Sequence, residues 1–331
     1  MAQNTHIEWC HDTLNLWWGC TKASDGCKFC YAEHLADQRY HKGNFGPKGV
    51  RQEVKSWRST LNNISKLAKE TGVRRRVFCQ SMSDTFEGPE TMGGAGSENW
   101  KTTSRLRLEL MMAIQDHPEL DFLLLTKRPE NAAMFFAQKH DGKGILDICG
   151  NIWIGTSVED QKTADERIPH LLQIPAKVRF LSCEPLLGPI DISSFLYMSG
   201  DMGEPAPLLY PKSHLVIGGG ESGPNARPMH PAWPRSLRDQ CVAAGVPFFF
   251  KQWGEYHPRL RNGAWPDGSK QSDGCCDHLP GVHLYRDGTR AGELGTASKD
   301  EAPVNMKRVG KHRAGRLLDG CEWSELPVVA Q

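Results

Sequence analysis

The sequence has almost no net charge and no long apolar run, and each absence argues against a class of protein. Its 40 basic and 39 acidic residues leave a net charge of +1, so composition gives no general affinity for nucleic acid or anionic membranes. No apolar run approaches the roughly 18 residues that a membrane-spanning helix needs. The opening stretch MAQNTHIEWC lacks the basic and apolar regions of a secretory signal. We therefore expect a cytoplasmic protein without membrane contact.

A disulfide framework is also not expected. The 11 cysteines are odd in number and scattered along a chain without an export signal. Thiols that cluster in a reducing compartment are more often ligands or catalysts. At 331 residues the chain is long enough for one large domain or two average ones, and it has no repeat or obvious linker. We predict a single domain.

Short runs of β-branched or aromatic residues alternate with helical patterns. The runs are almost continuously apolar, which is typical of parallel strands buried on both faces. We predict strands at 14–18, 76–81, 121–126, 151–157, 178–183, 214–220 and 247–253. We predict helices at 30–40, 59–71, 103–116, 129–140, 163–173 and 231–244. This alternation predicts an α/β fold, either a full or partial (β/α) barrel or a doubly wound open sheet.

The C-terminal part of the chain departs from this pattern. Residues 254–303 are rich in Gly, Pro and Asp and have weak periodicity, which is typical of an insertion, an active-site cover or a small subdomain. We assign residues 1–253 to the barrel domain. We expect residues 254–331, a loop-rich insertion and a C-terminal segment, to complete the same domain.

The stretch WGCTKASDGCKFCYAE places Cys20, Cys27 and Cys30 in a loop after the first predicted strand. Such folds keep their chemistry on that side of the sheet. Structural zinc needs four protein ligands, whereas three cysteines on an iron–sulfur cubane leave one iron open to a small molecule. For zinc the fourth ligand would have to be Cys10, His11 or His34. The spacing alone leaves zinc, iron–sulfur and unligated thiols open.

The segment GCKFCYAE resembles the cluster loop of radical S-adenosylmethionine (SAM) enzymes, in which an aromatic or hydrophobic residue, here Phe29, precedes the last cysteine. The usual loop is C-x3-C-x2-C, and this sequence has three extra residues between its first two cysteines. Further segments are similar, in order and over nearly the whole chain, to a widespread phage-borne radical-SAM-like family. They are IEWC, SMSDTF, LLLTKRPE, NIWIGTSVED, RFLSCEPLLGPI, GGGESGPNARP, PFFFKQWGE and AGRLLDG.

The resemblance implies a radical SAM barrel in which Cys20, Cys27 and Cys30 hold a [4Fe-4S] cluster and SAM chelates the fourth iron. Reduction by a donor such as flavodoxin or ferredoxin would release methionine and a 5′-deoxyadenosyl radical that abstracts a hydrogen atom. The protein would bind, orient and exclude water. Phage proteins of this type include an isomerase of thymidine hypermodification, which rearranges 5-Nα-glycinylthymidine in DNA to its Cα-linked isomer. DNA carrying modified thymidine is then the expected substrate, in the host cytoplasm.

The first candidates beside the cluster lie in the N-terminal half. Phe29 would lie against adenine or pack the loop onto the barrel. Ser83 or Asp84 would contact the SAM amino group or ribose, although Asp84 could instead cap a helical segment. Lys127 and Arg128 form a positive cluster that suits a carboxylate or DNA phosphate, or that pairs with a glutamate after a later strand.

Further candidates follow the later strands, where barrel enzymes place catalytic side chains. Glu159 and Glu184 are cofactor-binding candidates and the expected alternative partners of the positive cluster. Cys183 could donate a hydrogen atom to a product radical, or simply fill space in its strand. Glu221, in the segment GGGESG, would bind ribose hydroxyls or substrate, or belong to a plain glycine turn. Lys251 is a candidate for the substrate's carboxylate.

Nucleic-acid signals are local. The runs MKRVGKHRAGR (306–316) and RRR (74–76) suit phosphate contacts, and equally a solvated surface. Tryptophans could stack on an extruded base or lie in the core; they are Trp17, Trp18, Trp253 and Trp265. Cys275 and Cys276 match no part of the family pattern.

Two other interpretations stay open. Within the radical SAM class, the reaction could be repair of pyrimidine photoproducts, or another nucleotide modification. Outside it, the chain could be a non-catalytic, zinc-stabilised nucleic-acid-binding module whose basic C-terminal run is the working surface. Metal identity separates the two classes.

Overall fold

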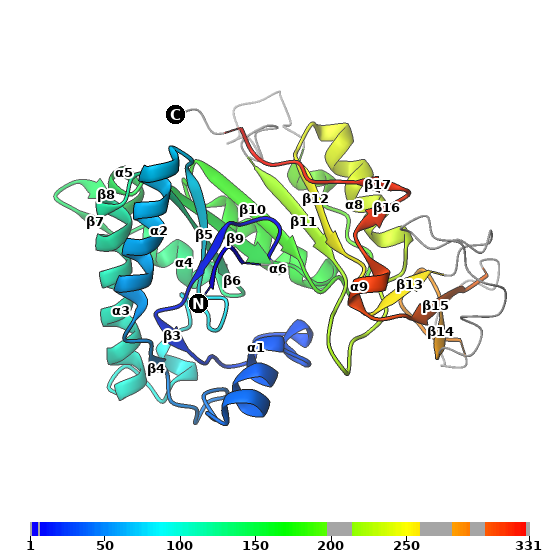
Figure 1. Cartoon of the computed structure of the whole chain (residues 1–331), viewed down its shortest axis with the longest axis horizontal. Coiled ribbons are helices and arrows are strands. Elements are labelled where there is room, and N and C mark those ends of the chain that lie inside the picture. The colour runs from blue at the N-terminus through cyan, green and yellow to red at the C-terminus, as the bar shows by residue number, and fades with distance from the viewer. Residues whose placement is uncertain (1, 6, 197–213, 259–279, 292–301, 329–331) are drawn as a thin grey trace. The chain divides into compact units, whose positions relative to one another are not determined.

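The computed structural model describes residues 2–5, 7–196, 214–258, 280–291 and 302–328 (Figure 1). The chain divides into two compact units, here called unit 1 and unit 2. Unit 1 consists of Met1–Ser157 and Arg167–Phe180, and unit 2 of Val158–Glu166 and Leu181–Val328. Strand β10 (Val178–Cys183) and helix α6 (Gln161–Leu172) each contribute residues to both. Whether residues 254–331 complete a single domain stays a prediction.

Unit 1 is built on a mostly parallel sheet whose strand order is β1-β2-β5-β6-β9. The strands are β1 (Ala2–Gln3), β2 (Asp12–Leu14), β5 (Arg75–Cys79), β6 (Leu120–Thr126) and β9 (Ile152–Ser157). Only β1 pairs antiparallel in this row. Nearly every side chain in β2, β5, β6 and β9 is buried, as the continuous apolar runs predict.

Long helices accompany this sheet: α2 (Trp57–Thr71), α3 (Glu98–Asp116) and α4 (Pro129–Phe136). Helix α2 buries an apolar stripe at helical spacing, including Leu61, Ile64 and Ala68. Helix α3 begins five residues before the predicted start at 103, because the Ser97 side chain caps it by accepting a hydrogen bond from the Trp100 amide. Smaller elements complete the unit: β3 (Trp17–Trp18), β4 (Gln52–Glu53), α1 (Tyr31–His34), α5 (Ile145–Ile148), β7 (Lys139–His140) and β8 (Lys143–Gly144).

Unit 2 contains the parallel pair β11 (Leu215–Gly219) and β12 (Phe248–Gln252). Helix α8 (Ala232–Ala244) connects them and ends at Gly245, whose φ of 68° is the left-handed conformation that glycine adopts most easily. A three-stranded antiparallel sheet follows, in the order β13 (Tyr256–Pro258), β15 (Val304–Arg308), β14 (Gly281–Leu284). The remaining elements are α7 (Ser193–Leu196), α9 (Lys311–Ala314), β16 (Leu317–Leu318) and β17 (Cys321–Glu322).

The predicted α/β fold with parallel strands is confirmed, and it is compatible with a partial (β/α) barrel. Six of the seven predicted strands agree with the structure to within about two residues at each end. The first does not: the run 14–18 contains the end of β2 and then β3, which pairs antiparallel with β4. Within the described ranges, no helix combines the length and the apolar character that crossing a bilayer requires. The radical SAM type of barrel stays a prediction.

The close packing of β9 yields a stability prediction. A Cβ atom at Gly155 would overlap the buried ring of Phe180, whereas a Cβ at Gly218, in β11, would lie 3.5 Å from the Phe248 ring. We expect Gly155→Ala to lower the free energy of unfolding by about 1–3 kcal/mol through overpacking. The matched control Gly218→Ala should cost clearly less. Urea denaturation followed by circular dichroism measures both, and equal midpoints would contradict this reading of the packing.

Candidate functional site

The three predicted metal ligands lie in a segment of unit 1 with little regular structure. Cys27 ends a 3₁₀ turn, and Cys30 is the N-cap residue of α1, which continues into one turn of π-helix (Leu35–Arg39). Cys27 is buried, while Cys20 and Cys30 are half-buried, and all three are free thiols. The Cys30 side chain packs against a small core that contains Ala32, Ala36 and Met82.

The chain leading to Cys20 runs beside the residues that follow β5. The Asn15 side chain donates to Ser81 Oγ (3.0 Å) and accepts from the Met82 amide (2.9 Å). The Gly19 amide donates to the Met82 carbonyl (3.0 Å). Because β2 and β5 are parallel neighbours, the cysteine loop leaves the sheet at the carboxyl ends of their strands, where the chemistry was expected.

Ser83, a predicted cofactor contact, also joins the residues that follow β5 to the chain leading to Cys20. Its hydroxyl donates to the Trp17 carbonyl (3.1 Å). Phe29, the residue expected to lie against adenine, is half-buried, and the Lys28 ammonium lies 5.6 Å from the centre of its ring. Trp17 itself is fully buried, so its role is that of a core residue.

Asp84 is buried, and its carboxylate accepts four hydrogen bonds. The donors are the amides of Phe86 (2.9 Å) and Lys127 (3.1 Å), the Thr126 hydroxyl (2.7 Å) and the Arg128 guanidinium (3.0 Å). A carboxylate offers about four lone-pair sites. A SAM amino group would therefore have to displace one of these donors. The positive cluster after β6 pairs, through Arg128, with Asp84.

Burial and neighbouring charges act on two of the three cysteines, Cys20 and Cys30. Burial raises the pKa of the Cys20 thiol well above its ordinary value, and the carboxylates of Glu87 and Asp84 and then Cys30 and Cys27 raise it further. Burial also raises the pKa of Cys30, although backbone donors near the start of α1 oppose this. Metal ligation requires thiolates, so bound iron or zinc would have to offset this desolvation.

The donor set therefore suits a soft metal centre. Soft thiolates favour zinc or iron–sulfur clusters, and all three come from one short segment. Among the residues that the structure describes, no three His, Cys, Asp or Glu side chains converge as closely as a metal ion requires. Binding would have to draw the three sulfur atoms together.

In unit 2 the structure brings together two predicted site residues, Lys251 and Glu184. The Lys251 ammonium lies 2.9 Å from Glu184 Oε1, and the Ser182 hydroxyl donates to Glu184 Oε2 (3.2 Å). Gly219 leaves room for this pair, because a Cβ there would come within 3.0 Å of the carboxylate. The side chains are 20% and 13% exposed, so the pair is not sealed from solvent.

The other candidates of unit 2 are more enclosed. Glu221 is buried and forms a bidentate pair with Arg227 (2.7 and 2.8 Å), whose amide also donates to it. Glu159 is buried, and its backbone is held by Thr163 (2.9 Å). Cys183 has no exposed surface, and burial raises the pKa of its thiol.

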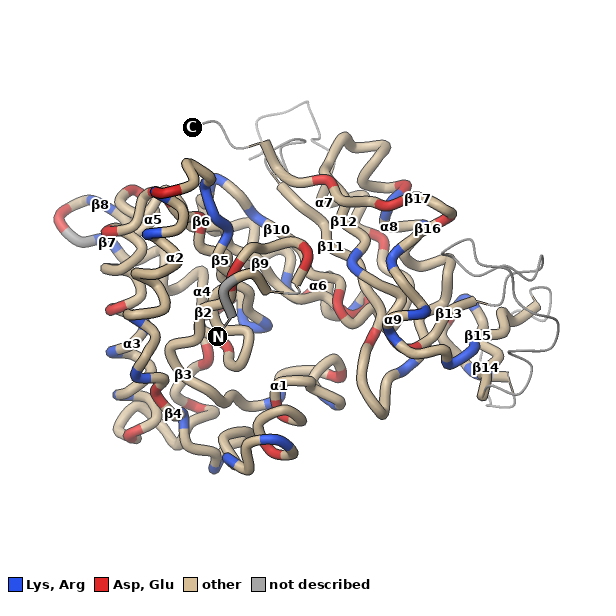
Figure 2. The backbone as a smooth tube through the Cα atoms, in the orientation of Figure 1, with Lys and Arg blue, Asp and Glu red and all other residues tan. Residues whose placement is uncertain are grey.

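Many of the residues predicted to contact nucleic acid form ion pairs or hydrogen bonds within their own unit. Arg74 and Arg75 pair with Asp121 (2.8 Å) and Asp12 (2.7 Å), and Arg76 donates to the Trp9 carbonyl (3.2 Å), so each arginine of the run RRR has a partner within unit 1. Basic positions do gather along β15 and α9 (Figure 2), but Arg308 donates to backbone carbonyls (2.7 and 3.0 Å). Buried Trp253 donates to a backbone carbonyl (2.9 Å). Three named residues, Trp265, Cys275 and Cys276, lie outside the described residues.

Sequence reasoning missed several polar residues around the cysteine loop, among them Asn15, Arg51, Gln80 and Glu87. Gln80 is the most unusual, with a φ of 66° and a buried side chain. Its Oε1 accepts a hydrogen bond from the Leu16 amide (2.9 Å), while Nε2 has no partner in the described part of the chain. Strained backbone and an orphaned buried donor are typical of functional sites. Nothing in the letters around Gln80 signals either feature.

Fold and site together define an α/β protein with a cysteine-rich loop at the carboxyl ends of parallel strands. The chain belongs to the family described as "Protein of unknown function (DUF5131)", whose family model matches residues 4–327. No curated protein and no solved structure matches the chain.

The backbone at Gln80 yields a second prediction. Gln80→Gly and Gln80→Ala both remove the contact with the Leu16 amide, but only glycine adopts the left-handed conformation without cost. We expect the glycine variant to be more stable by about 1–2 kcal/mol. At neighbouring Asn15, which is not left-handed, the order should reverse, with glycine less stable by about 0.5–1 kcal/mol. Urea denaturation of the four variants decides; the same order at both positions would refute strain at Gln80.

Proposed function

We propose that this protein is a radical SAM enzyme in which Cys20, Cys27 and Cys30 hold a [4Fe-4S] cluster. The observation that carries the proposal is three free thiols in one loop at the carboxyl ends of parallel strands, with Cys27 and Cys30 close enough to Cys20 to help raise its pKa. Three cysteines leave one iron of a cubane for SAM. When bound, the cluster and SAM would supply a 5′-deoxyadenosyl radical that removes hydrogen from an unactivated carbon.

The fourth ligand of a structural zinc site is hard to find here. His11 accepts a hydrogen bond from the Arg76 amide through Nδ1 (2.8 Å), and the neighbouring Cys10 thiol donates to the Ile7 carbonyl (3.6 Å). Arg76 lies at the amino end of β5, whereas the cysteine loop lies at its carboxyl end. Of the three candidates for the fourth zinc ligand, Cys10, His11 and His34, only His34 lies near the loop. This supports the iron–sulfur proposal over zinc.

The proposed substrate is 5-Nα-glycinylthymidine in phage DNA, as the resemblance implies. The bond between the thymidylyl methylene and nitrogen breaks, the methylene bonds to the glycyl α-carbon, and one hydrogen moves from that carbon to nitrogen. The product is an isomer, so the rearrangement itself consumes no oxidant or reductant. Lys251 would hold the glycyl carboxylate in exchange for part of its contact with Glu184. Repair or another nucleotide modification is the alternative within this class.

Anaerobic reconstitution tests the chemistry. We expect the wild type to bind about four iron atoms per chain and to form 5′-deoxyadenosine from SAM and dithionite. A Cys20, Cys27, Cys30 triple alanine variant should lose both properties because it lacks the ligands. A control with Cys149 and Cys321 replaced by alanine, both outside the loop, should keep them. A colourless wild type with stoichiometric zinc would instead support the nucleic-acid-binding module.

The substrate has its own test. An oligonucleotide containing 5-Nα-glycinylthymidine should keep its mass and gain a primary amine detectable with amine-selective reagents. In Lys251→Met the KM for this oligonucleotide should rise about tenfold or more, since a charge-assisted contact is lost. Lys162→Met, which removes an exposed lysine of α6, should leave KM unchanged. If the wild type forms 5′-deoxyadenosine but leaves the 5-Nα-glycinylthymidine oligonucleotide unchanged, this substrate is refuted. The proposed radical SAM chemistry is then unaffected.

A further inference from the structure

Thr21 directly follows Cys20, and each of its polar atoms contacts a charged side chain. Its amide donates to Glu87 Oε1 (2.8 Å), and its hydroxyl accepts from Arg51 Nη2 (2.9 Å). Its carbonyl accepts from Arg128 Nη2 (2.8 Å). The hydroxyl also donates to the Thr91 carbonyl (3.2 Å).

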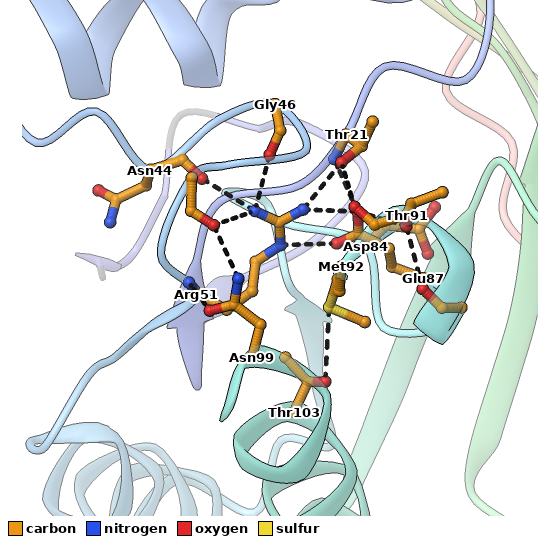
Figure 3. A network of polar contacts seen from close by, with 12 residues as sticks. Thr21, Asn44, Gly46, Arg51, Asp84, Glu87, Thr91, Met92, Asn99 and Thr103 are labelled. Atoms are coloured by element: carbon orange, nitrogen blue, oxygen red, sulfur yellow. Dashed lines mark hydrogen bonds and ion pairs between the residues drawn. The ribbon is translucent and has the colours of Figure 1, made fainter. Parts of the chain in front are cut away.

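The Arg51 guanidinium is the centre of this network (Figure 3). Its contacts with Glu87 are bidentate, at 2.8 and 2.7 Å, and the two side chains are 0% and 1% exposed. Its Nη1 donates to three backbone carbonyls, at 2.8 to 3.2 Å, those of Asn44, Gly46 and Gly49. The five N–H groups of the guanidinium therefore all have acceptors.

The second ion pair reaches Thr21 from the other side. Arg128, the N-cap residue of α4, divides its guanidinium between Asp84 (3.0 Å) and the Thr21 carbonyl. Asp84 is in turn held by the end of β6 through the Thr126 hydroxyl. Cys20 is fixed as well, because its carbonyl accepts from the Gly46 amide (3.0 Å).

The surroundings of Cys27 differ. Its amide donates to the Ser24 carbonyl (2.9 Å) within the same loop. The ion pair that spans the loop, Lys22 with Glu33, has side chains 51% and 26% exposed, and such exposed pairs contribute little rigidity. Cys20 is therefore anchored by buried charge from distant segments, whereas the hydrogen bond of the Cys27 amide is local to the loop.

We propose that Arg51, Glu87, Arg128 and Asp84 are positioning residues that fix Thr21, and thereby hold Cys20 in place before a cluster binds. Cys27 and Cys30 then close onto an anchored first ligand. This inference rests on the proposed function. It also explains why four buried charges surround a residue that is itself no ligand.

The test compares two buried arginine–carboxylate pairs of unit 1. Arg51→Lys keeps the charge but loses the fork that reaches Thr21, and Thr21→Val removes only the hydroxyl. The matched control is Arg75→Lys, which alters the buried pair Arg75–Asp12 (2.7 Å; side chains 10% and 0% exposed). This pair lies at the amino ends of β2 and β5, whereas the cysteine loop lies at their carboxyl ends. Arg51→Lys and Arg75→Lys should both lower the melting temperature.

The readouts are iron loss to a chelator, the electron paramagnetic resonance spectrum of the reduced cluster, and iodoacetamide labelling of the metal-free protein. We expect Arg51→Lys to lose iron about tenfold faster than the wild type and to show altered g values. Relative to the wild type, its labelling rate should increase more at Cys20 than at Cys27. Thr21→Val should change in the same direction by a smaller factor. Arg75→Lys should match the wild type in all three.

Two results overturn the inference. If Arg51→Lys and Arg75→Lys lose stability equally and show the same iron loss and spectrum, the pair is structural only. If Cys20 labelling is the same in Arg51→Lys and the wild type, Thr21 does not hold Cys20. If the wild type takes up no iron, the proposed function is refuted, and Arg51, Glu87, Arg128 and Asp84 have no role in cluster binding. The labelling arm still shows in that case whether Cys20 is held.

Discussion

The arrangement of the cysteine loop depends on the burial of one ion pair, Arg51–Glu87. Taking two charges out of water costs several kcal/mol per ion unless the geometry is good and the remaining donors and acceptors are satisfied. Here every guanidinium N–H has an acceptor, and three of those acceptors are backbone carbonyls of residues 44–49. The pair is therefore fully satisfied only when residues 44–51, Glu87 and Thr21 all occupy their final positions, so the positions of these three segments depend on one another.

The strands could be predicted because a parallel sheet buried on both faces leaves an unbroken apolar run, and few other structures do. The same rule failed at residues 14–18. That run is apolar because Trp17 is buried after the chain has left the main sheet, in the short pairing of β3 with β4. Apolar character reports burial, and it does not distinguish a central strand from a well-packed strand end. The start of α3 was missed for another reason: its cap, Ser97, precedes the apolar pattern by several residues.

At the candidate site the three cysteines could be predicted from the sequence, but the residues that hold their loop in place could not. A spacing of C-x6-C-x2-C can be read locally, and so can polar residues after a strand. Arg51 and Gln80 could not be read in that way, because their partners lie 36 and 64 positions away along the chain. Asp84 was noticed for its place after β5, but its Arg128 partner follows another strand. A long-range polar network leaves no periodicity in a single sequence.

The saturation of each carboxylate separates residues that position from residues that can meet a ligand. Asp84 and Glu221 are buried, and each accepts several hydrogen bonds from side chains and amides of its own unit. Replacing the donors of Asp84 by a ligand would take the buried charge of Arg128 away from its carboxylate, which is strongly unfavourable. A ligand at Glu221 would have to displace the bidentate contact with Arg227. The pair Lys251–Glu184 retains exposed surface, so water can solvate either group while a ligand carboxylate exchanges. At this pair a ligand carboxylate would therefore meet a smaller desolvation penalty than at Asp84.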